Sequence, residues 1–182
     1  EARFGPLTTP APDAEGAVPL EEILVTGVPA PTALRLLEHV LAHDVRARVH
    51  VLVPPAFADD AAAALAAFPA DRLRVLTGDA AAMDLGLATG EYRALAATVT
   101  TIHHLAALFP IGLDPRARRR HRVEGTRSVI ELAADAPRLR RLIHWSSVRV
   151  SGDREGVVRE DELDRGQGFH SLDDRALFDA ER

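Results

Sequence analysis

Two pairs of adjacent polar residues could contribute catalytic or metal-binding groups. Ser146 and Ser147 follow the stretch RLIHW and could supply a catalytic hydroxyl, but we favour strand-end residues that hydrogen-bond to the backbone. His103 and His104 end the apolar stretch VTTIHH, in which neighbouring side chains face opposite ways, so one of them is expected in the core. No H-x-H or H-E-x-x-H spacing accompanies them, and we predict no metal site.

A third group of chemically capable residues closes the chain, in HSLDDRALFDAER. His170, Asp173 and Asp174 could form an acid/base group. Carboxylates are also common in the first turn of a helix, where they interact favourably with its dipole. We favour the second interpretation, a helix start.

The strongest local charge feature is PRARRRHR, residues 115–122. A solvated helix face is the interpretation we favour. The alternative is a site for an anion or an acidic protein surface, formed by arginines that bind carboxylates and phosphates well. Its members are Arg116, Arg118, Arg119 and Arg120.

Composition excludes several other mechanisms. The 182 residues contain no Cys and no Lys, so disulfides, thiolate catalysis and a catalytic ammonium are all excluded. Tyr92 is the single tyrosine. The net charge of −5 and the aromatic content of 4% argue against a nucleic-acid partner. No apolar run approaches a membrane span, so we expect no membrane association. Composition leaves the compartment open, and we take the cytoplasm as the default location.

The elements that must position these residues alternate along the chain. Residues 1–20 are rich in Pro and Ala and predict a flexible arm, and 21–182 form one domain. The pattern predicts strands at 21–27, 47–55, 71–79, 99–108 and 138–152, the last with its exit loop, and helices at 31–44, 58–68, 89–99 and 114–136. Such alternation is typical of a doubly wound parallel sheet, an α/β fold with helices on both faces.

Several motifs at matching spacing point to one family. They are VTGVPAPTALRLL after the first strand, GD (78–79), HLAAL (104–108), VEGTRSVIELA (123–133) and HWSSVRVSGDREGVVREDELDRGQGF (144–169). From about residue 22 onward the chain resembles the extended short-chain dehydrogenase/reductases, in particular the branch of thioester reductases and fatty acyl-CoA reductases. The resemblance implies a Rossmann-like domain, here truncated after the fifth strand and the following helix, without the C-terminal substrate-binding part.

The resemblance also implies where NAD(P) would bind, at positions that are only partly retained. Gly27 matches the first glycine of the phosphate-binding turn, whereas Ala30 and Ala33 stand at the next two. The methyl of Ala30 crowds the place where the pyrophosphate comes close. Pro29 and Pro31 lack the N–H donors of that turn. The remaining matched positions are Thr32, Pro54 in place of an Arg, Asp79, Ala106 and Ala107.

The catalytic positions implied by the resemblance are mostly replaced. Ser147 matches the family's Ser, but Arg122 stands at its Asn, and Asp173 and Leu177 stand at its Tyr and Lys. Tyr92 precedes the fourth strand, and no sensible alignment places it at the position of the family's Tyr. Since Tyr and Lys act together in proton transfer, their joint loss favours a non-catalytic domain, a pseudo-enzyme used for scaffolding, protein interaction or ligand sensing.

The alternative is an active NAD(P)-dependent reductase of a carbonyl or thioester. We expect no bound cofactor, or NAD(P) if binding is retained. The family resemblance further implies a homodimer through the long helix at 114–136.

Overall fold

The computed structural model describes residues 20–106 and 114–182 and confirms the expected α/β fold. Five parallel strands form one sheet in the order β3-β2-β1-β4-β5. Their bounds are β1 (Glu22–Thr26), β2 (Arg48–Val53), β3 (Leu73–Thr77), β4 (Thr101–His104) and β5 (Arg141–His144).

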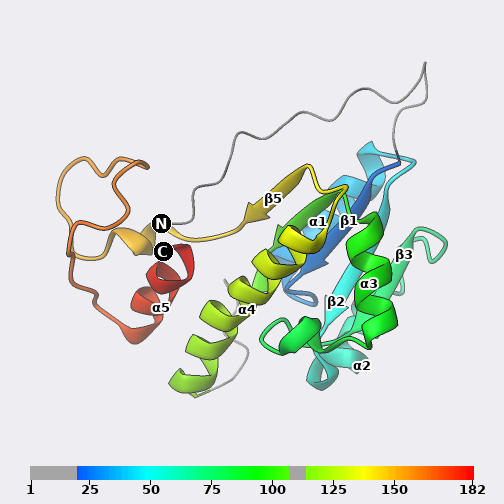
Figure 1. The fold of residues 1–182 in the computed structure, drawn as a ribbon, viewed down its shortest axis with the longest axis horizontal. Helices are drawn as coiled ribbons and strands as arrows, with labels where there is room; N and C mark the ends of the chain where they lie inside the picture. The colour runs from blue at the N-terminus through cyan, green and yellow to red at the C-terminus, as the bar shows by residue number, and fades with distance from the viewer. Residues whose placement is uncertain (1–19, 107–113) are drawn as a thin grey trace.

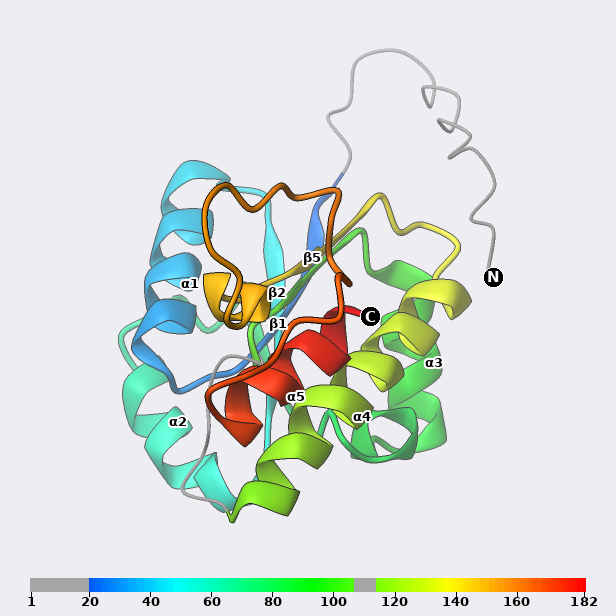
Figure 2. The same ribbon diagram turned by 90° about the vertical axis from the view of Figure 1, so that its left-hand side faces the viewer.

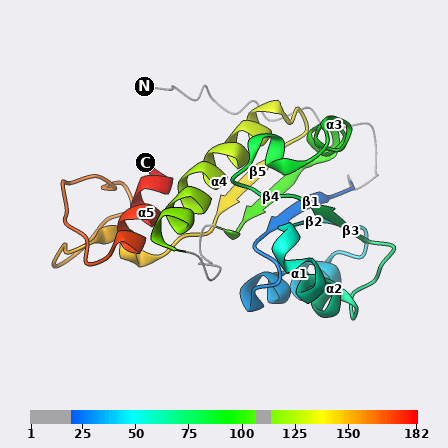
Figure 3. The same cartoon turned by 90° about the horizontal axis from the view of Figure 1, so that it is seen from below.

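Helices cover both faces of the sheet, as the doubly wound pattern predicts. Their bounds are α1 (Pro31–His43), α2 (Ala58–Leu65), α3 (Thr89–Thr98), α4 (Pro115–Asp135) and α5 (Leu172–Glu181). Helices α1 and α2 lie on one face and α3 and α4 on the other (Figure 3), while α5 lies beside α4 (Figure 1). Within residues 20–106 and 114–182, short 3₁₀ helices interrupt the loops at η1 (Pro55–Phe57), η2 (Met83–Gly86) and η4 (Val148–Ser151).

The central strand β1 explains why the sheet is stable. Its residues Leu24 and Val25 are completely buried. They point to opposite faces, so that Val25 packs in the cluster with Leu37 of α1 and Leu24 in the cluster with Leu132 of α4. Burial of such side chains on both faces contributes roughly 1.5–3 kcal/mol each.

The strand order creates one reversal point, which is where ligands bind in open α/β sheets. The chain runs from β1 to β2 and β3, and then returns to place β4 on the other side of β1. The register pairs Thr26 of β1 with His104 of β4 at their carboxyl ends. The loops leaving β1 and β4 therefore meet at the reversal point. In open α/β sheets, ligands bind at this place, beyond the carboxyl ends of the strands.

The fourth strand is shorter than the predicted 99–108. The backbone N–H groups of Leu105 and Ala106 leave the ladder and donate to the side-chain oxygen of Thr26, both at 3.1 Å. The apolar sequence continues past His104, but the strand-to-strand hydrogen bonds of the sheet end there. Ala107 and all but Leu20 of the predicted arm lie outside the described residues. None of the described helices has the length and apolar character needed to cross a membrane.

Candidate dinucleotide site

The turn after β1 is formed by a glycine that no other residue can replace without strain. Gly27 has φ +96°, a conformation that side chains disfavour. A Cβ at this position would lie 3.0 Å from the carbonyl carbon of Leu105 and 3.1 Å from the amide nitrogen of Ala106. The close contact places Ala106 next to the turn, so two of the matched positions come together at the reversal point.

The first turn of α1 has backbone N–H groups that remain available to bind an anion. Pro31 is the first helical residue and no side chain caps the helix. The N–H of Ala30 donates to the carbonyl of Gly27 at 3.0 Å. The amides of Thr32 and Ala33 have no acceptor in the described part of the chain, as expected for the second and third positions of a helix. Two donors therefore face the reversal point, where a dinucleotide phosphate would meet them.

A buried network holds the carboxyl ends of β1 and β4 together. The hydroxyl of Thr26 accepts from two backbone amides, so its own hydrogen is left for the Nδ1 atom of His104, at 2.9 Å. The hydroxyl of Thr126 in α4 donates to the carbonyl of Arg122 at 2.7 Å. It therefore accepts from Nε2 of His104, at 3.2 Å.

These bonds fix one form of His104, the neutral ring with its hydrogen on Nε2. His104 is completely buried, and burial lowers its pKa from 6.5 to about 3, with a further contribution from nearby His144. The sequence-based expectation that one histidine of the pair packs in the core is confirmed.

The partner histidine lies on the opposite face of β4. His103 is half-buried, and the indole Nε1 of Trp145 donates to its Nδ1 at 3.3 Å. Trp145 packs against the core cluster that includes Val28 and Ala33. Burial and the neighbouring Arg141 lower the pKa of His103. In the described ranges 20–106 and 114–182, no three His, Asp or Glu side chains converge as metal ligands would.

Asp79, the residue matched to the adenine contact, is already engaged. Its Oδ1 accepts from the backbone amide of Ala81 at 2.9 Å and lies 3.4 Å from Nδ1 of His121 in α4. Its side chain is 29% exposed, so it remains accessible at the rim of the sheet. Pro54 follows β2 and precedes η1.

Two of the positions matched to catalytic residues form an ion pair. Arg122 is only 5% exposed, and its Nη1 donates to the backbone carbonyl of Asp173 at 2.9 Å and lies 3.0 Å from Oδ1 of the same residue. Nε of Arg118 is 3.4 Å from that carboxylate. Burial lowers the pKa of Arg122, while Asp173 opposes this shift. The pair joins α5 to α4, which lie side by side in Figures 1 and 2.

The other two matched positions lie on neighbouring elements. Ser147 precedes η4, and its hydroxyl accepts from the amide of Arg149 at 3.4 Å, which agrees with a strand-end residue bonded to the backbone. Arg149 in turn lies 3.6 Å from the carboxylate of Asp174, so η4 and the start of α5 are close. Leu177 is 4% exposed and packs in the interior. Ser171 caps α5, and both Asp173 and Asp174 lie in its first turn, which confirms the predicted helix start.

The arginine run forms the solvated face that we favoured only in part, because Arg116, Arg119 and Arg120 are exposed whereas Arg118 is half-buried. Arg122 is buried, and three of the four proposed anion-binding arginines contact this chain. Arg118 pairs with Asp173, Arg119 lies 3.1 Å from Asp179, and Arg120 donates to the carbonyl of Ala81 at 2.9 Å. The run departs from the prediction at Arg118 and Arg122 because the folded chain brings Asp173 of α5 against α4. An external acidic partner or anion at this run, and the homodimer, stay predictions.

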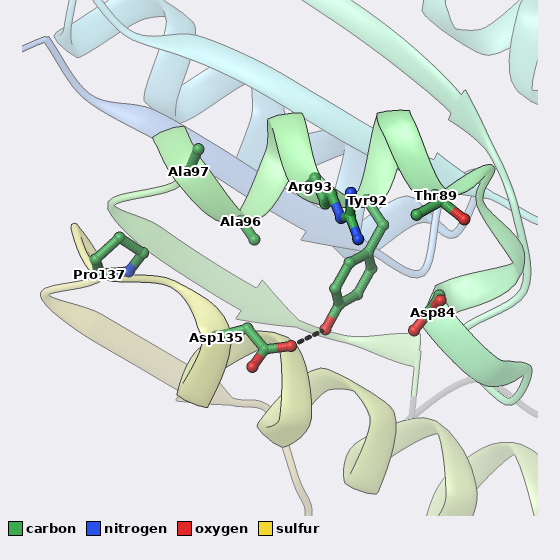
Figure 4. A pocket seen from close by; sticks show the side chains of 8 residues that line it. All are labelled: Asp84, Thr89, Tyr92, Arg93, Ala96, Ala97, Asp135 and Pro137. Atoms are coloured by element: carbon green, nitrogen blue, oxygen red, sulfur yellow. Dashed lines mark hydrogen bonds between the residues drawn. The ribbon is translucent and has the colours of Figure 1, made fainter.

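Tyr92 lies away from all of these residues. Figure 4 shows its ring extending from α3 toward the end of α4, where the hydroxyl donates to Oδ2 of Asp135 at 2.9 Å. Burial, this hydrogen bond and the charges of Asp135 and Asp84 raise its pKa. The structure agrees with the prediction that Tyr92 does not replace the missing tyrosine.

Comparison with known proteins identifies the family. Residues 26–181 match the profile of an NAD-binding family described as Male sterility protein. The chain belongs to this family. This family is the thioester reductase branch of the extended short-chain dehydrogenase/reductases, as the motifs indicated.

Individual relatives come from biosynthetic enzymes. The terminal R domain from the myxalamid PKS-NRPS biosynthetic pathway is 27% identical, with a TM-score of 0.76 over 92% of this chain and 45% of that domain. The reductase domain of a nonribosomal peptide synthetase from Mycobacterium tuberculosis is 22% identical, with a TM-score of 0.67 over 90% and 43%. A linear gramicidin synthase from Brevibacillus parabrevis is 35% identical over 52% of this chain and 2% of that protein. The chain thus spans less than half of the length of these relatives.

Sequence reasoning missed the residues that hold the site together. Thr26 lies inside the motif VTGVPAPTALRLL, but its bonds to the loop after β4 depend on the strand order and cannot be read from the sequence. The ion pair between Arg122 and Asp173 was missed as well, because the two residues lie 51 positions apart in the sequence.

Proposed function

We propose that this chain is the nucleotide-binding part of an NAD(P)-dependent reductase that acts on a carbonyl or thioester group. The observation that carries the proposal is the turn at Gly27, where the backbone approaches the loop after β4 so closely that a Cβ would meet it. Family membership and the two available amides of Thr32 and Ala33 support it.

The residues present fit a dinucleotide in part. The uncapped first turn of α1 can receive a phosphate through Thr32 and Ala33, and its dipole favours negative charge there. Pro29 and Pro31 remove two donors, so we expect weaker binding than a full glycine-rich turn provides. When bound, NAD(P)H supplies a hydride.

A matched pair of variants tests this proposal. Thr32→Glu places a carboxylate in the first turn of α1, where it favours the helix but repels a phosphate. Thr89→Glu makes the same change in the first turn of α3, at the other face of the sheet. Calorimetric titration with NADPH and with NADH should show binding to the wild type and to Thr89→Glu, and at least tenfold weaker binding to Thr32→Glu. Absence of binding to the wild type at millimolar cofactor would refute the proposal.

A second candidate function is a non-catalytic family member that binds a ligand or a protein without turnover. The observation that favours it is the ion pair between Arg122 and Asp173. The pair occupies two positions that the family resemblance assigns to catalytic residues, the Tyr that transfers the proton and the Asn of the long helix, and the carboxylate that replaces the Tyr is held by Arg122 and Arg118. Ser147 alone does not complete an acid/base group.

Turnover separates the two candidates. The purified chain would be incubated with NADPH and octanoyl-coenzyme A, and NADPH absorbance followed over time. Consumption that depends on both substrate and protein, and that Ser147→Ala reduces, supports the reductase. Cofactor binding without consumption supports the non-catalytic candidate.

A further inference from the structure

Helix α1 carries two histidines four residues apart, His39 and His43, in the stretch HVLAH. Residues at this spacing lie on the same face of a helix, with Cβ atoms about 5–6 Å apart. Their imidazole rings lie against each other, with centroids 4.0 Å apart and planes tilted by 31°. Both residues are exposed, on an outer helix of the molecule (Figure 2). Two histidines at this spacing on one helix face can bind a single metal ion together.

A hydrogen bond to the helix backbone prepares His43 as a metal ligand. Its Nδ1 atom lies 2.8 Å from the backbone carbonyl oxygen of His39. A carbonyl oxygen only accepts, so Nδ1 carries the hydrogen, and Nε2 of the neutral ring has a free lone pair. Metal-binding histidines commonly have this arrangement, because a bond from the second nitrogen to a backbone carbonyl fixes the tautomer and the orientation of the ring.

The ring of His39 supplies the second nitrogen. Its ring nitrogens have no hydrogen-bond partner in the part of the chain that the structure describes, so no such bond opposes rotation of the ring. Two nitrogens bound to one Zn²⁺ at about 2.0–2.1 Å, in tetrahedral geometry, lie about 3.3 Å apart. Since the ring centroids are 4.0 Å apart, rotation of the His39 side chain can bring its nitrogen to that separation from Nε2 of His43.

The two nitrogens, rather than nearby carboxylates, determine which ions the pair selects. Charged residues of both signs flank the pair in the sequence, at Arg35, Glu38, Asp44 and Arg46. Asp44 is already engaged, because its Oδ1 accepts from the backbone amides of the two residues that begin two positions further on. Imidazole nitrogen suits Zn²⁺, Ni²⁺ and Cu²⁺, whereas Mg²⁺ prefers oxygen ligands. The pair is therefore expected to select transition-metal ions.

We propose that His39 and His43 bind one divalent transition-metal ion, such as Zn²⁺, through one ring nitrogen each, and that water occupies the remaining coordination positions. Val40 stands where the hydrolytic motif H-E-x-x-H has its Glu, so the pair binds a metal without the general base of a metalloprotease. The proposal does not depend on NAD(P) binding, because the pair lies at the end of α1 and Thr32 at its start.

Calorimetric titration with Zn²⁺ tests the proposal on the full chain after treatment with a chelator. The wild type should bind one Zn²⁺ per chain, and Mg²⁺ should not bind at the pair. His39→Gln and His43→Gln should each weaken Zn²⁺ binding at least tenfold, because a chelate loses its advantage when either ligand is removed. His170→Gln, at another exposed histidine, is the matched control and should bind like the wild type.

A displaced pair separates a chelate from two independent histidines. Glu38→His combined with His43→Gln keeps two exposed histidines on α1, but adjacent residues point about 100° apart on a helix and do not converge on one ion. This variant should bind Zn²⁺ as weakly as His43→Gln alone. Zn²⁺ should also raise the midpoint of urea unfolding of the wild type and not of His43→Gln, because the pair converges only in the folded helix.

Three outcomes would overturn the proposal. The first is the absence of Zn²⁺ binding to the wild type at millimolar concentration. The second is a loss of affinity in only one or neither of the two single variants, or wild-type affinity in the displaced pair, which would indicate separate contacts to single histidines. The third is a stoichiometry of one Zn²⁺ per two chains, which would make a second copy of the chain the source of the remaining ligands.

Discussion

The buried ring of His104 makes a specific prediction about stability and pH. In the unfolded chain a histidine takes up a proton near pH 6.5, whereas the folded chain keeps His104 neutral down to a pKa of about 3. Between these values the unfolded state binds more protons, so the free energy of unfolding falls as the pH falls. The contribution is complete above pH 6.5 and is lost progressively toward pH 3.

The magnitude follows from the same two values. Each pH unit inside this window costs about 1.4 kcal/mol, so a decrease from pH 7.5 to pH 5 removes about 2 kcal/mol through His104 alone. The physical cause is that protonated Nδ1 would lose its bond from the Thr26 hydroxyl and carry a charge into the core.

Urea unfolding at the two pH values isolates this contribution. His104→Gln cannot titrate, so its loss of stability between pH 7.5 and pH 5 should be about 2 kcal/mol smaller than that of the wild type. His103 and His144 remain in both proteins and cancel in the comparison. His39→Gln, at an exposed position of α1, is the matched control and should behave like the wild type. Equal losses in the wild type and His104→Gln would refute the reasoning.

Three further predictions concern other contacts in the protein. Arg122→Ala and Asp173→Ala should each destabilise the chain by about 3–5 kcal/mol, and a double-mutant cycle by urea unfolding should show coupling above about 1 kcal/mol; additive effects would contradict the buried pair. Gly27→Ala should cost about 1–3 kcal/mol because of its positive φ and the nearby backbone, while Gly90→Ala, which meets nothing within 4 Å, should be neutral or stabilising by thermal unfolding. The single tyrosine, Tyr92, should ionise above its ordinary pKa of 10.0 in a spectrophotometric titration, and loss of its carboxylate partner should lower that pKa.

The sequence predicts the fold well because the central strands are apolar on both faces. EILVT and RVHVLV carry apolar residues on both faces, with polar residues such as Glu22 and His50 on one of them, and the helix between them is amphipathic, so a parallel sheet is the arrangement that buries both. The position of Gly27 follows from the same pattern, since it ends the first apolar run.

The ends of the elements and the side-chain contacts could not be predicted in the same way. The stretch HLAAL is as apolar as the strand before it, and β4 ends at His104 only because Thr26 captures the next two amides. Arg122 in turn lies in a charged run that predicts an exposed face. Its burial depends on Asp173 of α5, which follows it by 51 residues in the chain and meets it only after folding.

Trp145 allows the central claim to be tested directly, because it is the only tryptophan and packs against the cluster that includes Val28 and Ala33. Bound NADPH accepts excitation energy from a nearby indole and then emits at its own wavelength. Titration of the wild type with NADPH, excited at the tryptophan band, should produce sensitised nicotinamide emission that saturates, that NADP⁺ displaces and that Thr32→Glu suppresses. No sensitised emission at millimolar NADPH, or equal emission from the wild type and Thr32→Glu, would contradict a dinucleotide site at the turn after β1.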